Sequence, residues 1–378
     1  MTIVGLIISG GDYVEKKIHV LIVKKCMDIG SLESHIVRIL RVIDKTKMEF
    51  DFLLDYKECF HSVEIENLGG KIYCFHSCDD KKERENELSN FVRQGNYQIV
   101  IKVIECIDDI DDLNTLNNLG IKTNVIRLAA NVGIECRVIW EKLKNNTIVI
   151  VDEDSNYVIP LELCIEVLKI KNSLQLEKYR FNPIIRSQYR RELNFDEYFI
   201  VGNVARFYEA KNHKFLISIF RKFNKQCPQS KLVLVGDGEL RGELEEQISQ
   251  YQLEDKVVML GMRDDIANIL MAIDIFCLTS YEENTTNSIL EAQASGLDCI
   301  VSDSITKKSN ITGGVQYLSL NESEKWLSVL IQKYNKCENT IRDNAFYKLK
   351  RAGYDVNDLA DFLFKCYMSH IDGVAYDT

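Results

Sequence analysis

The sequence predicts an α/β fold made of two Rossmann-like domains, each with a parallel sheet. The chain has 378 residues, which is enough for about two domains of ordinary size. From Tyr198 onwards, apolar runs of strand length alternate with segments of helical period, which is the pattern of βαβ units. The N-terminal half repeats this alternation less cleanly. Composition agrees with two buried cores, because 46% of the residues are hydrophobic and 28% are charged.

The N-terminal half begins with a short apolar run, MTIVGLIISGGD. This run has no basic flank and is too short for a signal sequence or a membrane span, so we expect an extra strand and a cytoplasmic protein. Further strands are expected at 17–23, 49–54, 70–75, 97–104 and 122–128, and helices at 32–43 and 81–95. The acidic run at 108–112 indicates the start of another helix, because acidic side chains favour helix N-termini.

The C-terminal half carries the clearer alternation. Its strands are expected at 198–205, 231–236, 256–261, 274–280 and 298–303, and its helices at 212–225, 239–251, 264–272 and 287–295. One face of the first helix is apolar, as packing on a sheet requires; it consists of Phe215, Leu216, Ile219, Phe220 and Phe223. We expect an N-terminal domain over 1–180, a C-terminal domain over 181–352, and a last helix over 353–378 that crosses back to the N-terminal domain.

Charge and cysteine content argue against a nucleic-acid-binding protein and against a zinc protein. The formal charge is -10, from 57 acidic and 47 basic residues, and no basic footprint for nucleic acid is present. The 12 cysteines are scattered, and Cys74 and Cys78 have no second pair that would complete a zinc site. We therefore expect reduced, packed thiols and no metal.

Two cations follow the first strand of the C-terminal half. In open α/β sheets, ligands bind beyond the carboxyl ends of strands, where helix N-termini present free N–H groups. Arg206 lies just past this strand, and Lys211 lies at the start of the next helix. The two could clamp a diphosphate through charge-assisted hydrogen bonds. Taken alone, they fit solvated surface cations better.

The stretch EENTTNSILEAQASG joins a loop to a helix. Ser288 and Glu291 fit a capping box, in which both residues cap that same helix. Alternatively, Thr286, Asn287 and Ser288 line a helix N-terminus that offers backbone and hydroxyl donors to a phosphate. In that interpretation, Glu283 and Glu291 accept hydrogen bonds from the hydroxyl groups of a ligand.

A glycine-bearing turn, VGDGELRGEL, follows another strand. Gly236 and Gly238 suit turn geometry more often than the approach of a ligand. Because the third glycine is Gly242, the spacing does not match the G-x-G-x-x-G fingerprint, which argues against an NAD site.

Five motifs in a fixed order resemble one enzyme family. GNVARFYEAKNH, LVLVGDGELR, VVMLGMRDDI, DIFCLTSYEEN and ILEAQASGLDCIVSD are similar to the nucleotide-sugar-binding domain of retaining glycosyltransferases of family 4, above all bacterial exopolysaccharide and capsule transferases. The resemblance implies a GT-B fold, in which two Rossmann-like parallel-sheet domains face each other across a cleft. It also implies metal-independent transfer from a nucleotide sugar, which we expect to be UDP-linked.

The resemblance assigns a role to each candidate residue. Arg206 and Lys211 would hold the donor diphosphate and neutralise the leaving group. Glu283 would bind the donor sugar and Glu291 the donor ribose, as the two ends of the E-x7-E motif. We take Arg206, Lys211 and Glu283 as catalytic. The remaining donor-binding candidates are Gly30, Gly238, Arg263, Thr286, Asn287 and Ser288.

Some positions depart from the family pattern. Ser31 stands at the second glycine of a Gly-Gly-x-Glu turn, and Asn284 replaces the glycine that normally follows Glu283. The family also carries a histidine near KTNVIRLAANVG, and this sequence has none there.

Two main hypotheses follow. The first is a retaining hexosyltransferase that moves a sugar from a nucleoside diphosphate sugar to a growing bacterial surface glycan or a lipid-linked acceptor. The alternative is a catalytically degenerate subunit that binds a nucleotide sugar or stabilises an active partner glycosyltransferase. A third interpretation is an epimerase or phosphorylase on the same fold; no lysine-rich cofactor-anchoring motif supports the phosphorylase variant.

A lipid-linked acceptor would bring the protein to the inner membrane face. The segment CRVIWEKLKNN, residues 136–146, sets basic side chains beside Trp140 and other apolar ones, which allows peripheral docking on anionic lipid. A solvated helix face over the core is the other interpretation of this segment.

Overall fold

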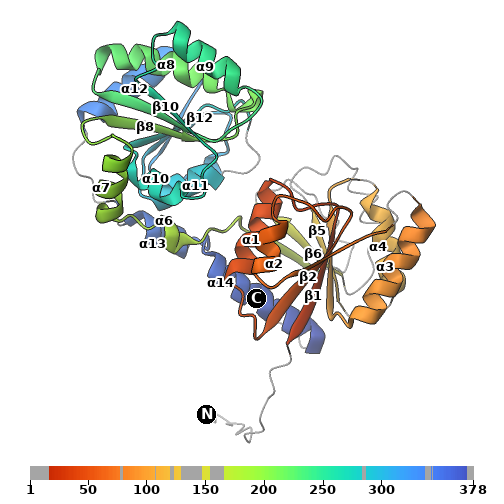
Figure 1. Ribbon diagram of the computed structural model, residues 1–378. Helices are drawn as coiled ribbons and strands as arrows, with labels where there is room; N and C mark the ends of the chain where they lie inside the picture. Colours follow the sequence, from red (N-terminus) through yellow and green to blue (C-terminus); the bar gives the residue numbers. More distant parts are fainter. Residues whose placement is uncertain are drawn as a thin grey trace, which may run out of the picture. The chain divides into compact units, whose positions relative to one another are not determined.

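The chain divides into two compact units, each built on one parallel sheet (Figure 1). One unit comprises the chain up to Ile170 together with the segment from Ala360 onwards, and the other runs from Lys171 to Leu359. The expected extra strand at the N-terminus and the segment at 136–146 lie outside the described residues. The computed structural model describes residues 17–76, 80–106, 108–119, 123–128, 147–153, 166–282, 287–336, 342 and 344–372.

The N-terminal sheet has seven parallel strands in the order β3-β2-β1-β4-β5-β6-β7. They are β1 (Ile18–Lys24), β2 (Met48–Leu54), β3 (Lys71–Cys74), β4 (Ile99–Ile104), β5 (Thr123–Leu128), β6 (Thr147–Asp152) and β7 (Glu166–Ile170). The helices of this half are α1 (Ser31–Val42), α2 (Ser62–Asn67), α3 (Lys81–Gly95) and α4 (Asp109–Asn118). Every expected strand and helix in the described part is confirmed, including the helix start in the acidic run; α2, β6 and β7 were not predicted.

The C-terminal sheet has six parallel strands in the order β10-β9-β8-β11-β12-β13. They are β8 (Phe199–Val204), β9 (Ser230–Val235), β10 (Val257–Gly261), β11 (Ile275–Leu278), β12 (Cys299–Ser302) and β13 (Val315–Leu318). The helices are α6 (Leu176–Tyr179), α7 (Pro183–Glu192), α8 (His213–Gln226), α9 (Arg241–Gln250), α10 (Ile266–Ala272), α11 (Asn287–Ala294), α12 (Ser323–Asn335), α13 (Asn344–Arg351) and α14 (Val356–Asp372), whose residues from Ala360 group with the N-terminal unit.

Helices cover both faces of the C-terminal sheet, and each face has its own core. Figure 1 shows α8 and α9 on one face and α10 and α11 on the other. The predicted apolar face of α8 is confirmed, because Leu216, Ile219, Phe220 and Phe223 are all buried in one core cluster together with Trp326 of α12. Burial on both faces is what a parallel sheet requires.

Each sheet reverses its strand order at one point. In the N-terminal sheet, the chain builds outwards from β1 through β2 to β3 and then continues on the other side of β1 with β4. In the C-terminal sheet, the same reversal separates β8 from β11. Ligands of open α/β sheets bind beyond the carboxyl ends of the strands at such a point. The loops after β1, β4, β8 and β11 are therefore the places to look for a site.

Packing within β8 yields a stability test. A Cβ atom at Gly202 would overlap the Ile273 side chain, whereas nothing lies within contact distance of a Cβ at Gly242 in α9. We expect Gly202→Ala to lower the free energy of unfolding by about 1–3 kcal/mol through overpacking. Gly242→Ala, the matched control, should leave it unchanged or raise it by up to ~1 kcal/mol, because alanine favours helices. Urea unfolding measures both, and equal effects would contradict the packing argument.

Candidate active site

The loops after β8 and β11 meet at the switch point of the C-terminal sheet. The Tyr281 backbone N–H donates to the Ala210 carbonyl oxygen at 2.8 Å. The Thr279 hydroxyl, just past β11, donates to the carbonyl oxygens of Lys211 and Asn212 at 3.2 and 3.0 Å. Asn212 adopts a left-handed φ of 50°, which lets the loop turn into α8. The backbone beside Lys211 is thus held from the neighbouring strand.

The two predicted cations lie together on this loop but differ in their surroundings. Arg206 is exposed and forms no ion pair with any described residue. Lys211 is half-buried, and its Nζ lies 5.6 Å from the centre of the Tyr208 ring. A guanidinium without a carboxylate partner, next to the start of a helix, can bind a phosphate group. Both cations therefore remain candidates for binding a phosphate group.

A buried histidine follows these two cations along the chain and was not among the predicted site residues. His213 is 1% exposed, and its ring meets the Phe207 ring edge to face with the centres 4.9 Å apart. Burial and the nearby charge of Lys211 lower the pKa of His213 to about 4, so the imidazole is neutral at pH 7. Neither ring nitrogen has a hydrogen-bond partner within the described ranges. In the sequence, only its position directly after Lys211 and Asn212 indicates that His213 lies beside this loop.

Part of the second predicted cluster lies at the start of α11. Glu283 and Thr286 lie outside the described residues. Asn287 and Ser288 are half-buried in the first turn, and Glu291 follows one turn later on the same face as Ser288. Because α11 already begins at Asn287, Ser288 cannot be its N-cap, and the predicted capping box with Glu291 is wrong.

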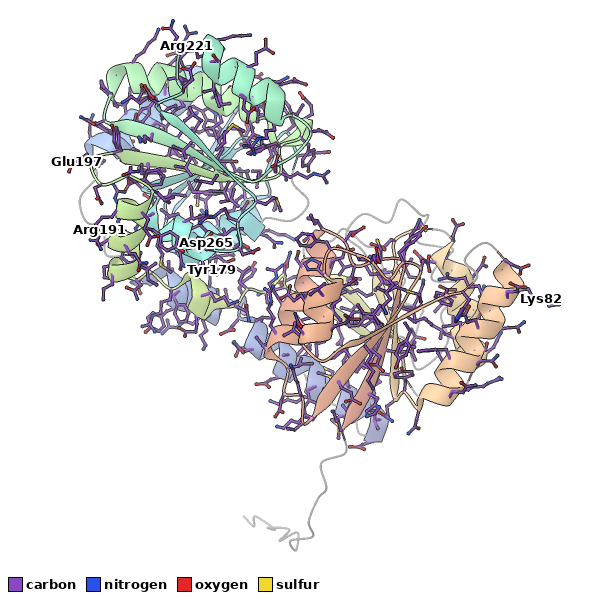
Figure 2. The ribbon with its side chains drawn as sticks, in the orientation of Figure 1. Lys82, Tyr179, Arg191, Glu197, Arg221 and Asp265 are labelled. Carbon is purple, nitrogen blue, oxygen red and sulfur yellow. The ribbon has the colours of Figure 1, made fainter. Side chains whose placement is uncertain are left out.

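Two further predicted contacts have roles within the chain. A Cβ at Gly238 would overlap the Phe207 backbone, and the Gly238 N–H donates to Asp237 Oδ1 at 2.8 Å. Glycine at this position lets the loop after β9 pack on the loop after β8. Arg263 donates from Nε and Nη2 to the two oxygens of Asp265, labelled in Figure 2, at 2.7 and 2.6 Å. A ligand bound by Arg263 would share its guanidinium with this pair.

The predicted glycine of the N-terminal unit lies just before α1. Gly30 is the N-cap residue, and a Cβ there would overlap the Glu33 carboxylate. That carboxylate lies 2.7 Å from the Nζ of Lys24, which also contacts Glu105 at 2.5 Å. Burial lowers the pKa of Lys24, but attraction by Glu105 and Glu33 outweighs it, so the pKa is raised and the ammonium is charged. A buried cation thus stands at the switch point between β1 and β4.

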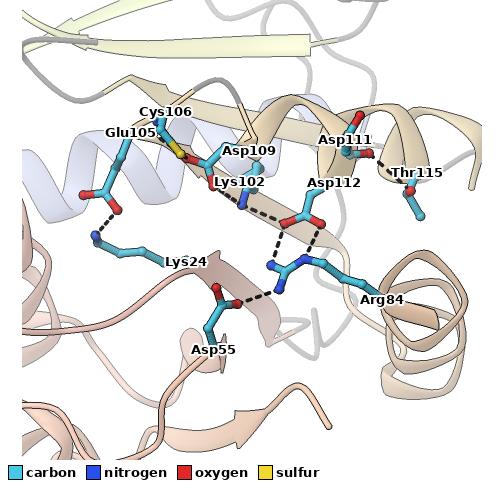
Figure 3. Close-up of polar contacts among 10 residues, drawn as sticks. All are labelled: Lys24, Asp55, Arg84, Lys102, Glu105, Cys106, Asp109, Asp111, Asp112 and Thr115. Atoms are coloured by element: carbon cyan, nitrogen blue, oxygen red, sulfur yellow. Dashed lines mark hydrogen bonds and ion pairs between the residues drawn. The ribbon is translucent and has the colours of Figure 1, made fainter. Parts of the chain in front are cut away.

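An ionic network continues along the carboxyl edge of the N-terminal sheet (Figure 3). Lys102 donates from Nζ to Asp109 and Asp112 at 2.7 and 2.8 Å. Arg84 donates to both oxygens of Asp112 at 2.8 and 2.9 Å and to Asp55 at 2.7 Å. Burial raises the pKa of Asp109 and Asp112, but attraction by Lys102 and the hydrogen bonds outweigh it, so both values lie below the usual range. The acidic run was predicted from the sequence, whereas its pairing with Lys102 and Arg84 was not.

The described part of the chain holds neither a candidate metal cluster nor a candidate membrane span. There, no group of three or more His, Cys, Asp or Glu side chains could hold a metal ion. No helix in the same ranges is long and apolar enough to cross a membrane. The cysteines of those ranges are free thiols, but only half of them are packed in a core. Buried are Cys227, Cys277, Cys299 and Cys366; half-buried are Cys26, Cys59 and Cys74; Cys106 is exposed.

Known proteins are similar to this chain in sequence and in fold. Residues 185–345 match the family Glycosyl transferases group 1. The chain is 30% identical to the putative glycosyltransferase EpsF of Bacillus subtilis (strain 168), over 92% of this chain and 96% of that protein. It is 32% identical to the UDP-Gal:alpha-D-GlcNAc-diphosphoundecaprenol alpha-1,3-galactosyltransferase of Escherichia coli, over 47% and 46% of the two chains. Anabaena Alr3699/HepE, solved in complex with UDP, superposes with a TM-score of 0.75 at 18% identity, over 93% of this chain and 100% of that chain.

The ionic network of the N-terminal unit yields a second test. Lys102→Met leaves two buried carboxylates without their shared cation, so we expect the free energy of unfolding at pH 7 to fall by about 3–5 kcal/mol. In the wild-type protein, Asp109 and Asp112 have lowered pKa values, so their contribution is present at neutral pH and is lost as the pH falls below about 4. In the variant, the pKa of Asp109 rises, so the deficit should shrink between about pH 7 and pH 4.

Denaturant unfolding at several pH values measures this difference. Lys81→Met is the matched control, because Lys81 pairs with Asp111 on the exposed side of the same helix pair, with side chains 64% and 42% exposed. It should leave the unfolding curve almost unchanged. A Lys102→Met deficit that is small, or that grows on acidification, would show that the network does not hold these carboxylates charged.

Proposed function

The chain belongs to the group 1 glycosyl transferases, and from this premise we propose that it is a retaining hexosyltransferase. It takes a sugar from a UDP-linked donor and passes it to a growing bacterial surface glycan or a lipid-linked acceptor. One observation carries the proposal. Arg206, exposed and without an ion-pair partner in the described ranges, lies with Lys211 on the loop that follows β8 at the switch point.

Arg206 and Lys211 hold the donor diphosphate in this proposal. Transfer breaks the bond between the anomeric carbon of the sugar and the diphosphate oxygen, so negative charge develops on the departing nucleotide. The two cations compensate that charge, and the N-terminus of α11 adds the positive end of a helix dipole. The proposed reaction is metal-independent, because the protein's own side chains supply the compensating charge.

Carboxylates bind the hydroxyl groups of the donor. Glu291, half-buried one turn into α11, accepts hydrogen bonds from the ribose. Glu283 lies outside the described residues and is proposed to bind the transferred sugar. The other proposed donor contacts are Gly30, Gly238, Arg263, Thr286, Asn287 and Ser288.

The proposed acceptor follows from the relatives. According to its name, the Escherichia coli protein uses UDP-Gal as the donor and a GlcNAc-diphosphoundecaprenol as the acceptor. We therefore favour a lipid-linked acceptor whose terminal sugar is N-acetylated. Such an acceptor sits at the inner membrane face, so the proposed location is cytoplasmic with peripheral contact to that membrane.

A catalytically degenerate subunit is the second candidate function. Ser31 opens α1 where the family has a glycine, and Glu33 of the same turn is engaged by the buried Lys24. Both features favour an acceptor-binding region that differs from the family pattern. Such a subunit would bind a nucleotide sugar, or stabilise an active partner glycosyltransferase, without transferring sugar itself.

Donor binding gives the third test. We expect Arg206→Ala and Glu291→Ala each to weaken UDP binding about 10- to 150-fold, because each removes hydrogen bonds with a charged group, worth about 1.5–3 kcal/mol. Arg221→Ala is the matched control, since this arginine of α8 stacks on Tyr251 at 4.3 Å and is not among the proposed donor contacts. Isothermal titration calorimetry measures the dissociation constants. Unchanged binding in both site variants would remove the donor site from this switch point.

Turnover separates the two candidate functions. Purified protein is mixed with UDP-, GDP- and ADP-sugars in the presence of acceptor-bearing membranes, and the release of nucleoside diphosphate is followed. We expect selective thermal stabilisation by UDP-sugars, by about 2.7 kcal/mol at a hundredfold excess over Kd, together with UDP release. Stabilisation without release would favour the degenerate subunit.

A further inference from the structure

The outer side of α13 in the C-terminal unit is basic. Tyr347, Lys348 and Arg351 are exposed there, and Arg351 follows the other two by four and three residues, so the three lie on one stripe of the helix. The opposite stripe, with Phe346 and Leu349, is buried in a core cluster shared with α6 and α11. The helix contains no acidic residue. It is therefore amphipathic, with a polar side of a single sign of charge.

Arg180, which directly follows α6, lies over two aromatic rings of α13. Its guanidinium carbon is 5.2 Å from the centre of the Phe346 ring and 5.7 Å from the centre of the Tyr347 ring. It also donates from Nη2 to the Tyr347 hydroxyl at 3.3 Å. Figure 1 shows α6 and α13 side by side. The Tyr347 ring, although 49% exposed, is thus held in position next to a cation.

Two more segments bring cations to the same helix. Lys171 donates from Nζ to the Ala352 carbonyl oxygen at 2.6 Å, just past the end of α13. Lys348 donates from Nζ to the Thr312 carbonyl oxygen at 2.6 Å, which ties α13 to the segment that follows the short 3-10 turn Lys307–Ser309. We call the surface formed by these segments the α13 face. Its cations are Lys171, Lys178, Arg180, Lys307, Lys308, Lys348, Lys350 and Arg351.

Charge sets the α13 face apart from the chain as a whole. The chain has 57 acidic and 47 basic residues, so acidic side chains are in excess overall. On the α13 face, Arg180 pairs with Glu177 at 3.9 Å and Lys350 pairs with Asp355 at 3.5 Å, whereas Arg351 forms no ion pair with any described residue. The helix dipole accounts for basic side chains in the last turn of α13, but not for those that other segments add. The face is therefore a positive area on an acidic protein.

We propose that the α13 face docks on an anionic lipid surface. Clusters of about four to eight Lys and Arg side chains are attracted to the negative headgroups of such a surface. Tyr347 stands among these cations, and its ring with a polar hydroxyl suits the headgroup layer. The inference rests on the proposed function for a lipid-linked acceptor at the membrane, and it adds to that function the surface that makes the contact.

Charge complementarity also selects one orientation on the bilayer. Screening at physiological ionic strength confines the attraction to side chains within about 8 Å of the lipid. The α13 face is attracted when it points to the bilayer, whereas an acidic part of the surface in the same position is repelled. Docking through this face would bring the donor-binding unit, to which α13 belongs, to the membrane that carries the acceptor.

The test compares two kinds of vesicle. Full-length protein is sedimented with vesicles of phosphatidylcholine alone, or of phosphatidylcholine and phosphatidylglycerol in equal parts. We expect at least about tenfold tighter binding to the mixture at 0.1 M salt and loss of the preference at 1 M salt, where the Debye length falls from about 10 Å to about 3 Å. Equal binding to both vesicles, no binding, or a preference that persists at 1 M salt would overturn the proposal. So would tighter binding to duplex DNA than to the mixture.

A charge-reversal variant ties the preference to the α13 face. Each cation near an anionic surface contributes about fivefold to binding, so Lys348→Glu with Arg351→Glu should abolish the tenfold preference. Lys222→Glu with Lys225→Glu is the matched control, because both lysines are exposed near the end of α8, which packs in a different core cluster.

The control changes the net charge equally and should keep the preference. If the reversal variant fails to fold, Lys348→Gln with Arg351→Gln decides. A lipid preference that survives in the folded variant contradicts the assignment to this face, as does an equal loss in the control.

The same samples also report on the donor site. A thermal shift with UDP reads the proposed donor contacts, none of which belongs to the α13 face. A normal UDP shift without any preference for anionic vesicles overturns the docking proposal and leaves the UDP-linked donor standing. A vesicle preference that the reversal variant loses, without any UDP shift, supports docking and contradicts the UDP-linked donor.

Discussion

Parallel alignment of the strands is the constraint on which both units depend. Every neighbouring pair in the two sheets is parallel, so each strand must be followed by a crossover, and helices must cover both faces. All carboxyl ends therefore collect at one edge of each sheet, together with the N-termini of the following helices. The loop with Arg206 and Lys211 after β8, the first turn of α11 and the N-cap at Gly30 are three results of this one arrangement. Chemistry is concentrated there because the first turn of each following helix leaves backbone N–H groups without an intrahelical partner.

Buried ion pairs fasten helices to these sheets. Lys102 stands in β4, where every residue is buried, and it is accepted there because α4 supplies two carboxylates. The C-terminal unit has a similar ionic contact between a helix and its sheet, because Asp274, just before β11, accepts hydrogen bonds from Arg186 and Arg190 of α7. Such pairs add little net stability compared with apolar packing. They do penalise any other placement of the helix, because an alternative position would leave the charges buried without partners.

Periodicity was enough to predict most of the fold, whereas contacts between distant segments were not predictable from it. The apolar face of α8 and the alternation of strands and helices follow from local patterns, and the GT-B fold expected from the motif order is confirmed by the relatives and by the two parallel sheets. β6 and β7 were not predicted, because no clear helical period separates them in the sequence. Lys102 is one lysine in an apolar run, and its partner network reaches Arg84 on another helix. The α13 face is assembled from segments that lie far apart in the sequence, which no pattern along the chain records.

The exposed guanidinium of Arg206 has a kinetic consequence. The chain carries a formal charge of -10, so its overall field repels a nucleotide with several negative charges. At physiological ionic strength, that field is screened beyond a Debye length of about 8 Å, and only cations at the binding loop act on the arriving ligand. Under the proposed function, both the arrival of the donor and the release of the freed nucleoside diphosphate are therefore governed by these few cations rather than by the formal charge of the chain.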